Sequence, residues 1–297
     1  MSCLSLGDLK ITGLTDLQSF NIPIKTLFPE INLKILKNLE VIDETILSRG
    51  LIHLTIRSWL LQQKGRLILV DSCVGANKNR PNHPSWHNRS GKEWLRALSK
   101  AGFKPEDIDI VMCTHLHADH VGWNTRLENG SWVPTFPNAQ YLCGKTEFSY
   151  WEGISNKSDK HGSFADSVLP LIENGKMDFV EDQDEVANGL SVQLSPGHTP
   201  GHLSLNSVNG AVFCGDIIHS PIQLKFPELS TAFCSDMALA RTTRENLLDK
   251  VDEENTNNNT EEDGLSEKEE RLTKDYQLKR ALDLIKGLSI FEETFEE

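Results

Sequence analysis

The sequence predicts a mixed α/β fold (α+β) in which stacked β-sheets are covered by helices. Short apolar runs typical of strands recur along the chain, with amphipathic stretches typical of helices between some of them. Strands in runs with helices outside them indicate stacked, helix-covered sheets. The length of 297 residues allows a full hydrophobic core and suits one large domain or two small ones. The strand-like runs are 53–61, 66–71, 108–113, 140–143, 191–195, 203–207 and 211–214.

The first elements surround a predicted hairpin. Residues 1–50 carry no chemical motif, and we expect them to form an N-terminal extension that packs on a main domain, residues 51–250. The polar segment 62–65 between two apolar runs predicts the turn of the hairpin. The loop 75–89 is rich in Asn, Pro and His, and is expected to be irregular and close to the mouth of a site.

Helix signals follow this loop. Ser90 and Glu93 have the spacing of a capping box at the start of a helix, and Gly102 is expected to end that helix. Two further helices are expected near 145–152 and 163–173. Each lies between strand-like runs, which agrees with helices on the outside of the sheets.

The chain changes character after about residue 249. Residues 251–265 are polar, acidic and of low complexity, and are predicted to be a disordered linker. Ser266 and Glu269 form a second capping-box pattern, which predicts a C-terminal helix over 266–297 that docks either on the domain or on a partner. The segment 252–297 holds 15 acidic and 6 basic side chains, so it carries nine of the chain's net thirteen negative charges.

Bulk composition argues against several classes of function. With most of the net charge of −13 in the tail, the rest of the chain shows no basic surface suited to nucleic acid. The sequence has no apolar run long enough to cross a membrane and no pattern of a secretory signal at its start. Six scattered cysteines without a CxxC pair suit reduced thiols, so we expect a cytoplasmic protein with no membrane or nucleic-acid partner.

The segment 114–122, which reads THLHADHVG, carries the clearest chemical signal. His115 and His117 fall on one face of an extended segment, because side chains alternate with a period of two. A turn after His117 lets Asp119 and His120 face the same point from another side. Neutral imidazoles and carboxylates suit a borderline divalent ion such as zinc. The apolar run just before this segment predicts a buried strand that ends at a metal site.

This HxHxDH run resembles the signature of the metallo-β-lactamase-fold superfamily. Three further motifs of that family are present in the expected order, and the resemblance covers about residues 53–247. It implies a four-layer αββα sandwich with the metals at one edge, incomplete or altered at the C-terminus. The three motifs are an apolar strand ending in Asp71, a Gly-His-Thr segment at 197–199, and a Gly-Asp pair at 215–216 after an apolar strand.

The resemblance also implies the cofactors and the roles of individual residues. It implies two zinc ions, with iron or manganese as alternatives. Asp119 is the implied catalytic residue, which orients the nucleophile or passes its proton to the leaving group. The implied metal ligands are His115, His117 and His198 for the first ion, Asp119 and His120 for the second, and Asp216 as a bridge.

Four other polar residues are candidates for the surroundings of the metals. Thr114 and Asp71 are expected either to orient ligands or to be satisfied polar groups at strand ends. His202 is expected to contact the pocket or to be a hydrogen-bonded structural residue, and His219 to line the pocket. The chain departs from the family in one respect: no histidine follows His219, where the family usually supplies a last ligand to the second metal.

The leading functional hypothesis is a metal-dependent hydrolase in which activated water attacks a small molecule. The GDIIHSPIQ run at 215–223 resembles a subgroup containing lactonases and methyl parathion hydrolases, which implies a lactone, ester or phosphotriester substrate. One alternative is a mononuclear iron oxygenase similar to the persulfide dioxygenases. The other is a degenerate, non-catalytic homologue. A homodimer is compatible with each hypothesis.

Overall fold

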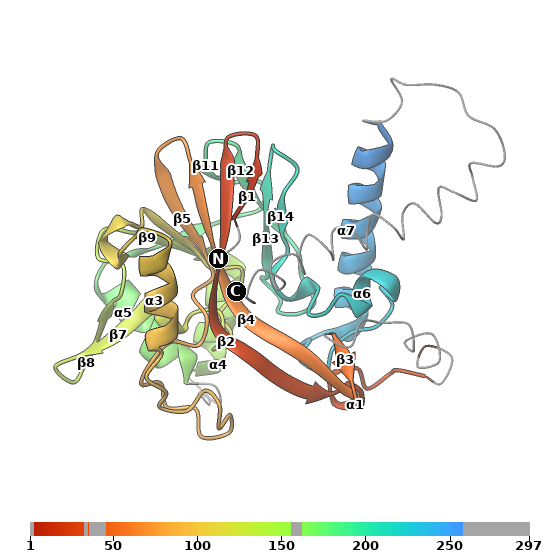
Figure 1. Ribbon diagram of the computed structural model, residues 1–297, viewed down its shortest axis with the longest axis horizontal. Coiled ribbons are helices and arrows are strands. Elements are labelled where there is room, and N and C mark those ends of the chain that lie inside the picture. Colours follow the sequence, from red (N-terminus) through yellow and green to blue (C-terminus); the bar gives the residue numbers. More distant parts are fainter. Residues whose placement is uncertain (1–2, 33–34, 36–45, 156–161, 258–297) are drawn as a thin grey trace, which may run out of the picture.

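Two β-sheets packed face to face, with helices on both outer sides, form the body of the protein (Figure 1). The computed structural model describes residues 3–32, 35, 46–155 and 162–257. This mixed architecture confirms the predicted fold class. The ends of the observed strands lie within a few residues of the ends predicted from the sequence.

The larger sheet has eight strands within the described residues, in the order β1-β2-β4-β5-β6-β9-β10, with β3 paired to β4. Pairing is antiparallel from β1 to β5 and parallel from β5 through β6 and β9 to β10. The strands are β1 (Cys3–Leu6), β2 (Leu9–Pro23), β3 (Leu47–Ser48), β4 (Leu51–Gln63), β5 (Arg66–Val70), β6 (Ile110–Met112), β9 (Gln140–Gly144) and β10 (Met177–Val180).

The smaller sheet is antiparallel and has four strands within the described part of the chain. These are β11 (Glu185–Ala187), β12 (Leu190–Leu194), β13 (Leu203–Ser207) and β14 (Val212–Phe213). A separate hairpin joins β7 (Thr125–Glu128) to β8 (Ser131–Pro134). The alternation along β5 explains the layers, because Ile68 and Val70 pack toward the smaller sheet while Leu69 packs under the helices.

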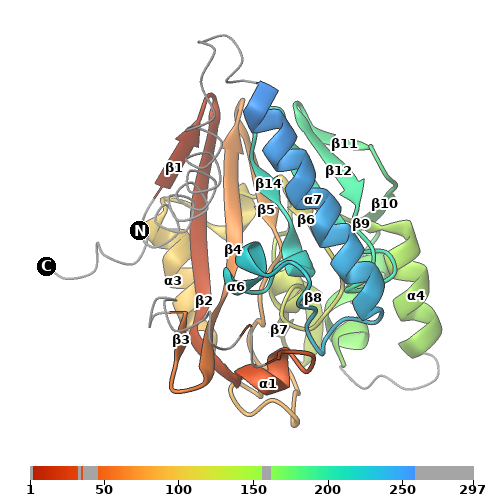
Figure 2. The same cartoon turned by 90° about the vertical axis from the view of Figure 1, so that its right-hand side faces the viewer.

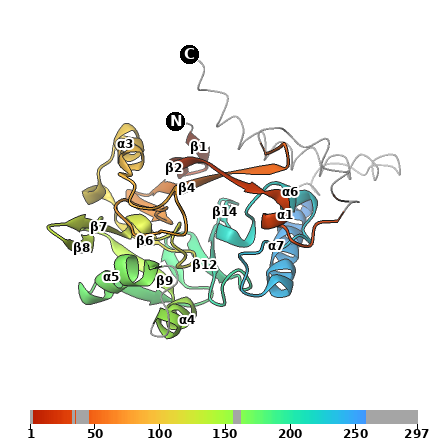
Figure 3. The same cartoon turned by 90° about the horizontal axis from the view of Figure 1, so that it is seen from below.

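Helices cover both outer faces (Figures 2 and 3). Buried residues of α3 and α5 share a core with the larger sheet, whereas α7 lies beside the smaller sheet. None of the helices in the described ranges is long and apolar enough to cross a membrane. The helices are α1 (Ile24–Leu27), α3 (Lys92–Lys100), α4 (Lys145–Ser155), α5 (Leu169–Glu173), α6 (Ile222–Lys225) and α7 (Met237–Asn257), with short turns η2 (Pro105–Asp107), η3 (Gly122–Asn124), η4 (Phe164–Val168) and η5 (Gly215–Ile217).

The N-terminal segment differs from the prediction of an extension. Strands β1 and β2 belong to the larger sheet, and β2 pairs with β4 along most of its length. Leu9, Ile11 and Leu14 of β2 are buried. Asp16 of the same strand accepts hydrogen bonds from the backbone of Val74 and Gly75, so this segment also fixes the loop after β5.

Two further expectations differ at helix ends. The capping box at Ser90 is not formed: α3 begins after Gly91, which has φ +60° and makes no side-chain cap. A Cβ at Gly91 would lie 2.6 Å from the Trp123 ring, so close packing determines this turn. Helix α7 continues to Asn257 and includes the start of the predicted linker, 251–265. The remainder of that linker and the predicted helix 266–297 lie outside the described residues.

Candidate metal centre

Four segments carry the candidate site, and each follows the end of a strand. Asp71 comes directly after β5, and residues 114–120 follow the parallel neighbour β6. Because β5 and β6 are parallel, their carboxyl ends meet at one edge of the sheet. Residues 196–202 connect β12 to β13, and residues 214–219 follow β14. The two sheets therefore bring ligands to the same edge from opposite sides.

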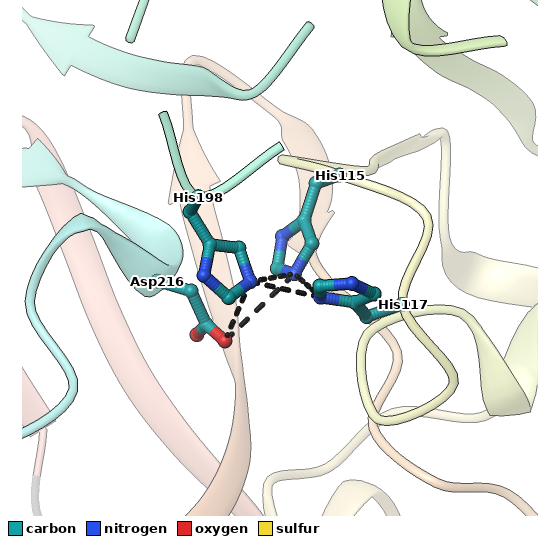
Figure 4. A group of neighbouring side chains, drawn as sticks. All are labelled: His115, His117, His198 and Asp216. Atoms are coloured by element: carbon teal, nitrogen blue, oxygen red, sulfur yellow. Dashed lines mark hydrogen bonds and ion pairs between the residues drawn. The ribbon is translucent and has the colours of Figure 1, made fainter. Parts of the chain in front are cut away.

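Three imidazoles and one carboxylate converge there as the first group, His115, His117, His198 and Asp216 (Figure 4). His115 Nε2 lies 3.0 Å from His117 Nδ1, and His198 Nε2 lies 2.8 Å from the same atom. His198 Nε2 and His115 Nε2 are 3.2 Å apart. Asp216 Oδ2 completes the group at 3.3 Å from His198 Nε2 and 3.8 Å from His115 Nε2.

The donor atoms of the first group fit a zinc-like ion. Burial lowers the pKa of His115 and His198 well below that of a free imidazole, because the charged form loses its hydration. A neutral ring keeps one nitrogen lone pair, so three ring nitrogens that face one point can serve together as ligands of a cation. Zinc–nitrogen bonds of about 2.0–2.1 Å in a tetrahedron separate the ligand atoms by roughly 3.3 Å. The observed spacing is close to that value.

Asp119, His120 and Asp216 form a second group beside the first. His120 Nε2 lies 3.1 Å from Asp216 Oδ1 and 3.8 Å from Asp119 Oδ2. Burial alone lowers the pKa of His120, but the carboxylates of Asp216, Asp71 and Asp119 raise it well above the usual value. This point of the molecule therefore favours a positive charge. The turn predicted after His117 is present, since His120 N donates to His117 O.

Asp71 and Thr114 orient the histidines from behind. Asp71 Oδ1 accepts a hydrogen bond of 2.8 Å from Thr114 N, and Asp71 Oδ2 lies 2.8 Å from His120 Nδ1. The Thr114 hydroxyl donates to Asp71 and lies 3.1 Å from His115 Nδ1. These contacts leave the Nε2 atoms of His115 and His120 facing the site. Asp71 has φ +57°, a left-handed conformation that places its carboxylate between the two neighbours.

Of the two roles considered for His202, the structure shows a hydrogen-bonded structural residue. Its Nε2 accepts a 3.1 Å hydrogen bond from the backbone N–H of Asp216. Burial lowers the pKa of His202 to about 3, so the ring is neutral. A Cβ at Gly215, which has φ +50°, would lie 2.6 Å from His202 Nε2. The ring therefore fixes the backbone that presents Asp216, and the Gly-Asp pair needs its glycine for this contact.

His219 lies at the edge of the two groups. Its Nε2 is 3.2 Å from Asp216 Oδ2, and its ring centroid is 4.9 Å from that of His198. The side chain is buried, and the backbone N–H of His219 donates to Gln223 Oε1. His219 is outside both ligand groups, whose donor atoms all lie within 4.8 Å of one another. It therefore lines the site next to Asp216, as the position three residues after that aspartate predicted.

Two buried residues near the site gave no signal in the sequence. Glu147, in the first turn of α4, accepts hydrogen bonds from both ligand-bearing loops. Arg244 of α7 donates to the carbonyl oxygens of Ile217 and Leu229, which fixes the segment after Asp216. Both side chains bond to groups distant in sequence, including backbone atoms, which no local pattern can reveal.

Tryptophan residues take different places around the site. The Trp151 ring contacts the edge of His117, with centroids 5.2 Å apart. Trp123 instead stacks on Trp94 in the core below the larger sheet, and Trp86 stacks on His83. Of Trp86, Trp123 and Trp151, it is Trp151 that makes a ring contact with a ligand residue.

The chain belongs to the metallo-β-lactamase superfamily, whose family model matches residues 53–255. This match and the fold confirm the resemblance seen in the motifs. An N-acyl homoserine lactonase of a Bacillus species is 26% identical over 176 residues, which are 55% of this chain and 62% of the relative. The lactonase AttM of Rhizobium radiobacter is 32% identical over 118 residues, 36% of this chain and 39% of the relative.

Two solved structures are similar over most of the chain. AidC, a dizinc quorum-quenching lactonase, has a TM-score of 0.66 at 23% identity, with 84% of this chain and 85% of AidC covered. The hydrolase AbOPH of the β-lactamase superfamily has a TM-score of 0.65 at 28% identity, with 82% of each chain covered. The likeness to AidC shows a common fold. The chain spans about 60% of the length of the Bacillus lactonases it matches.

Proposed function

We propose that this protein is a two-zinc hydrolase that opens lactone rings, with N-acyl homoserine lactones as the leading substrate class. The observation that carries the proposal is the convergence of six ligand side chains in two adjacent groups that share Asp216. Membership of a metallo-hydrolase superfamily and the lactonase relatives support the reaction class. Esters and phosphotriesters are the wider range of substrates to test, because the same attack on an electrophilic centre applies to them.

Two sets of residues would supply different parts of the chemistry: the first ligand group would bind the metal, and Asp119 would transfer the proton. In the first group, neutral imidazoles of His115, His117 and His198 supply three nitrogen donors, and Asp216 supplies a shared oxygen. Zinc bound there would lower the pKa of coordinated water to about 7 and polarise a carbonyl oxygen. Asp119, whose side chain is 24% exposed, is the carboxylate available to accept a proton and deliver it to the leaving oxygen.

The second group favours a hydrolase over the other two hypotheses. A mononuclear iron oxygenase needs one ligand group, which leaves Asp119 and His120 without a role. A non-catalytic homologue gives no reason for Asp71 to hold His120 Nδ1 at 2.8 Å. Retention of both the ligands and their supports agrees with a working two-metal site.

The experiment is a substrate survey on zinc-loaded protein. Purified full-length chain is assayed against N-acyl homoserine lactones, other lactones, aryl esters, thioesters and phosphotriesters. Asp119→Asn should lose most of the activity, on the order of 100-fold or more, because general acid–base catalysis typically contributes 10²–10⁴-fold. His53→Ala is the matched control, since its imidazole contacts Ser48 and Asn21 rather than the ligands.

Three outcomes separate the hypotheses. Lactone hydrolysis that depends on zinc and on Asp119 supports the proposal. Bound zinc without turnover of any of these substrates contradicts it. About one iron per chain, with oxygen uptake that depends on a thiol substrate, would favour the oxygenase instead.

A further inference from the structure

We infer that Glu147 is a positioning residue that sets the distance between the His115–His117 pair and His198. The inference rests on the proposed function, because it concerns how the first metal position is held in shape. Glu147 lies outside both ligand groups and is fully buried in the first turn of α4. A buried carboxylate is costly unless each oxygen finds hydrogen-bond donors, so the arrangement of its donors shows what it does.

Each oxygen of Glu147 binds a different part of the site. Oε1 accepts hydrogen bonds from Leu116 N at 3.0 Å and from Trp151 Nε1 at 2.6 Å. Oε2 accepts from Thr199 Oγ1 at 2.7 Å and from Gly201 N at 3.1 Å. One carboxylate therefore connects the loop that carries one ligand pair with the loop that carries the third histidine.

The positions of these donors in the sequence explain how Glu147 restrains the ligand histidines. Leu116 lies between His115 and His117, so its backbone N–H cannot move without both rings. Thr199 directly follows His198, so its hydroxyl holds the third ring from the other side. Trp151 adds a third connection, because its ring also contacts His117.

Backbone packing supports the same conclusion independently. A Cβ at Gly201 would lie 2.1 Å from Glu147 N and 2.5 Å from Glu147 Cα. The His198 loop therefore lies directly on the start of α4, and Gly201 is what permits this approach. Strands β6 and β9 are parallel neighbours, so the ligand loop and α4 leave the sheet at the same edge.

The hydrogen bonds to Glu147 counteract the effect of burial on its pKa. Burial raises the pKa of Glu147, while the hydrogen bonds from Thr199, Leu116 and Trp151 oppose the rise. The four donors occupy both oxygens of Glu147. Glutamine has the same shape but replaces one oxygen with a donor, so it cannot satisfy the two donors that face that oxygen.

The test compares zinc affinity in Glu147→Gln, Thr199→Val and the control Glu152→Gln, an exposed residue of the same helix. Metal-free protein is titrated with zinc against a chromophoric chelator, and thermal stability is measured without metal. We expect Glu147→Gln to weaken the tighter zinc about 10–100-fold, as is typical for losing a residue that orients ligands. Thr199→Val should cause a smaller loss, and Glu152→Gln none.

Cobalt substitution supplies a readout that a purely structural role would not change. In Glu147→Gln the visible absorption of bound cobalt should shift, because the three nitrogen donors no longer keep their relative positions. Wild-type protein that binds zinc while Glu147→Gln shows unchanged affinity and an unchanged cobalt spectrum would overturn the inference alone. Wild-type protein without zinc binding would contradict the proposed function instead. If Glu147→Gln fails to fold, wild-type zinc affinity in Thr199→Val would overturn the inference.

Discussion

The two ligand groups share Asp216 but differ in almost every other physical property. In the first group, the side chains of His115 and His198 are 0% and 1% exposed, and three imidazoles supply the donors. In the second, His120 and Asp119 are 13% and 24% exposed and lie among carboxylates. The first position is built for a tightly held ion. The second attracts positive charge but offers three ligand side chains where the first offers four, so we expect it to hold an ion less tightly.

The largest effect is expected from His198→Ala. This change removes one of the three nitrogen donors of the first group and leaves a cavity between the two loops. Zinc affinity at the first position should fall by more than about 100-fold, since even the loss of orienting residues costs 10–100-fold. Competition with a chelator measures the change, with His53→Ala as control. A variant that keeps wild-type affinity would show that His198 is not a ligand.

His120→Ala should affect only the second position. We expect zinc content to fall from about two ions to about one per chain, because the first group keeps its three imidazoles. Elemental analysis after gel filtration gives the stoichiometry, and the remaining ion should resist chelation as in the wild type. Loss of both ions in this variant would contradict the independence of the two groups.

These groups differ in how far the sequence predicted them. The HxHxDH spacing is local, so the alternation of His115 and His117 and the turn before His120 could be deduced from it. His198 and Asp216 needed the family pattern, because they come from other strands. Glu147 could not be found, since its partners in the two ligand-bearing loops lie 31 to 54 residues away and include two backbone N–H groups.

In the fold, too, the features that depend on contacts distant in sequence were not predicted. Apolar runs predicted the strands of both sheets, because a buried strand needs apolar side chains whichever strand it pairs with. The extension over residues 1–50 was wrong, since strand pairing of β2 with β4 has no local signature. The capping box at Ser90 was wrong because the contact of Gly91 with Trp123 determines that turn. Long-range packing overrode the local signal in both places.

Asp71→Asn should weaken the second position selectively. Asparagine keeps the shape and tolerates the left-handed φ of +57°, so the backbone should stay in place. Its amide nitrogen would face His120 Nδ1 in place of an acceptor oxygen, which disturbs the orientation of that ring. Affinity for the second zinc should fall about 10–100-fold, with a smaller effect on the first. Calorimetric titration separates the two binding events, and equal losses at both would be inconsistent with this role.

The smallest effect is a difference in pH dependence. The carboxylates around His120 raise its pKa, so the ring keeps its proton to higher pH and zinc must displace that proton. Affinity for the second ion should therefore rise with pH by up to about tenfold per unit until His120 is neutral. The first ion should be nearly insensitive there, because burial lowers the pKa of His115 and His198. Titrations in buffers of different ionisation enthalpy should show proton release for the second ion alone.

The most direct test of this inequality is stepwise removal of zinc from the intact protein with a chelator. We predict two stages: mild chelation removes the ion of the second position together with most of the activity, and the ion of the first position leaves only at much higher chelator concentration. Adding zinc back after the first stage should restore activity. Two equally tight ions that leave in a single step would contradict the account and indicate that His219 completes the second position.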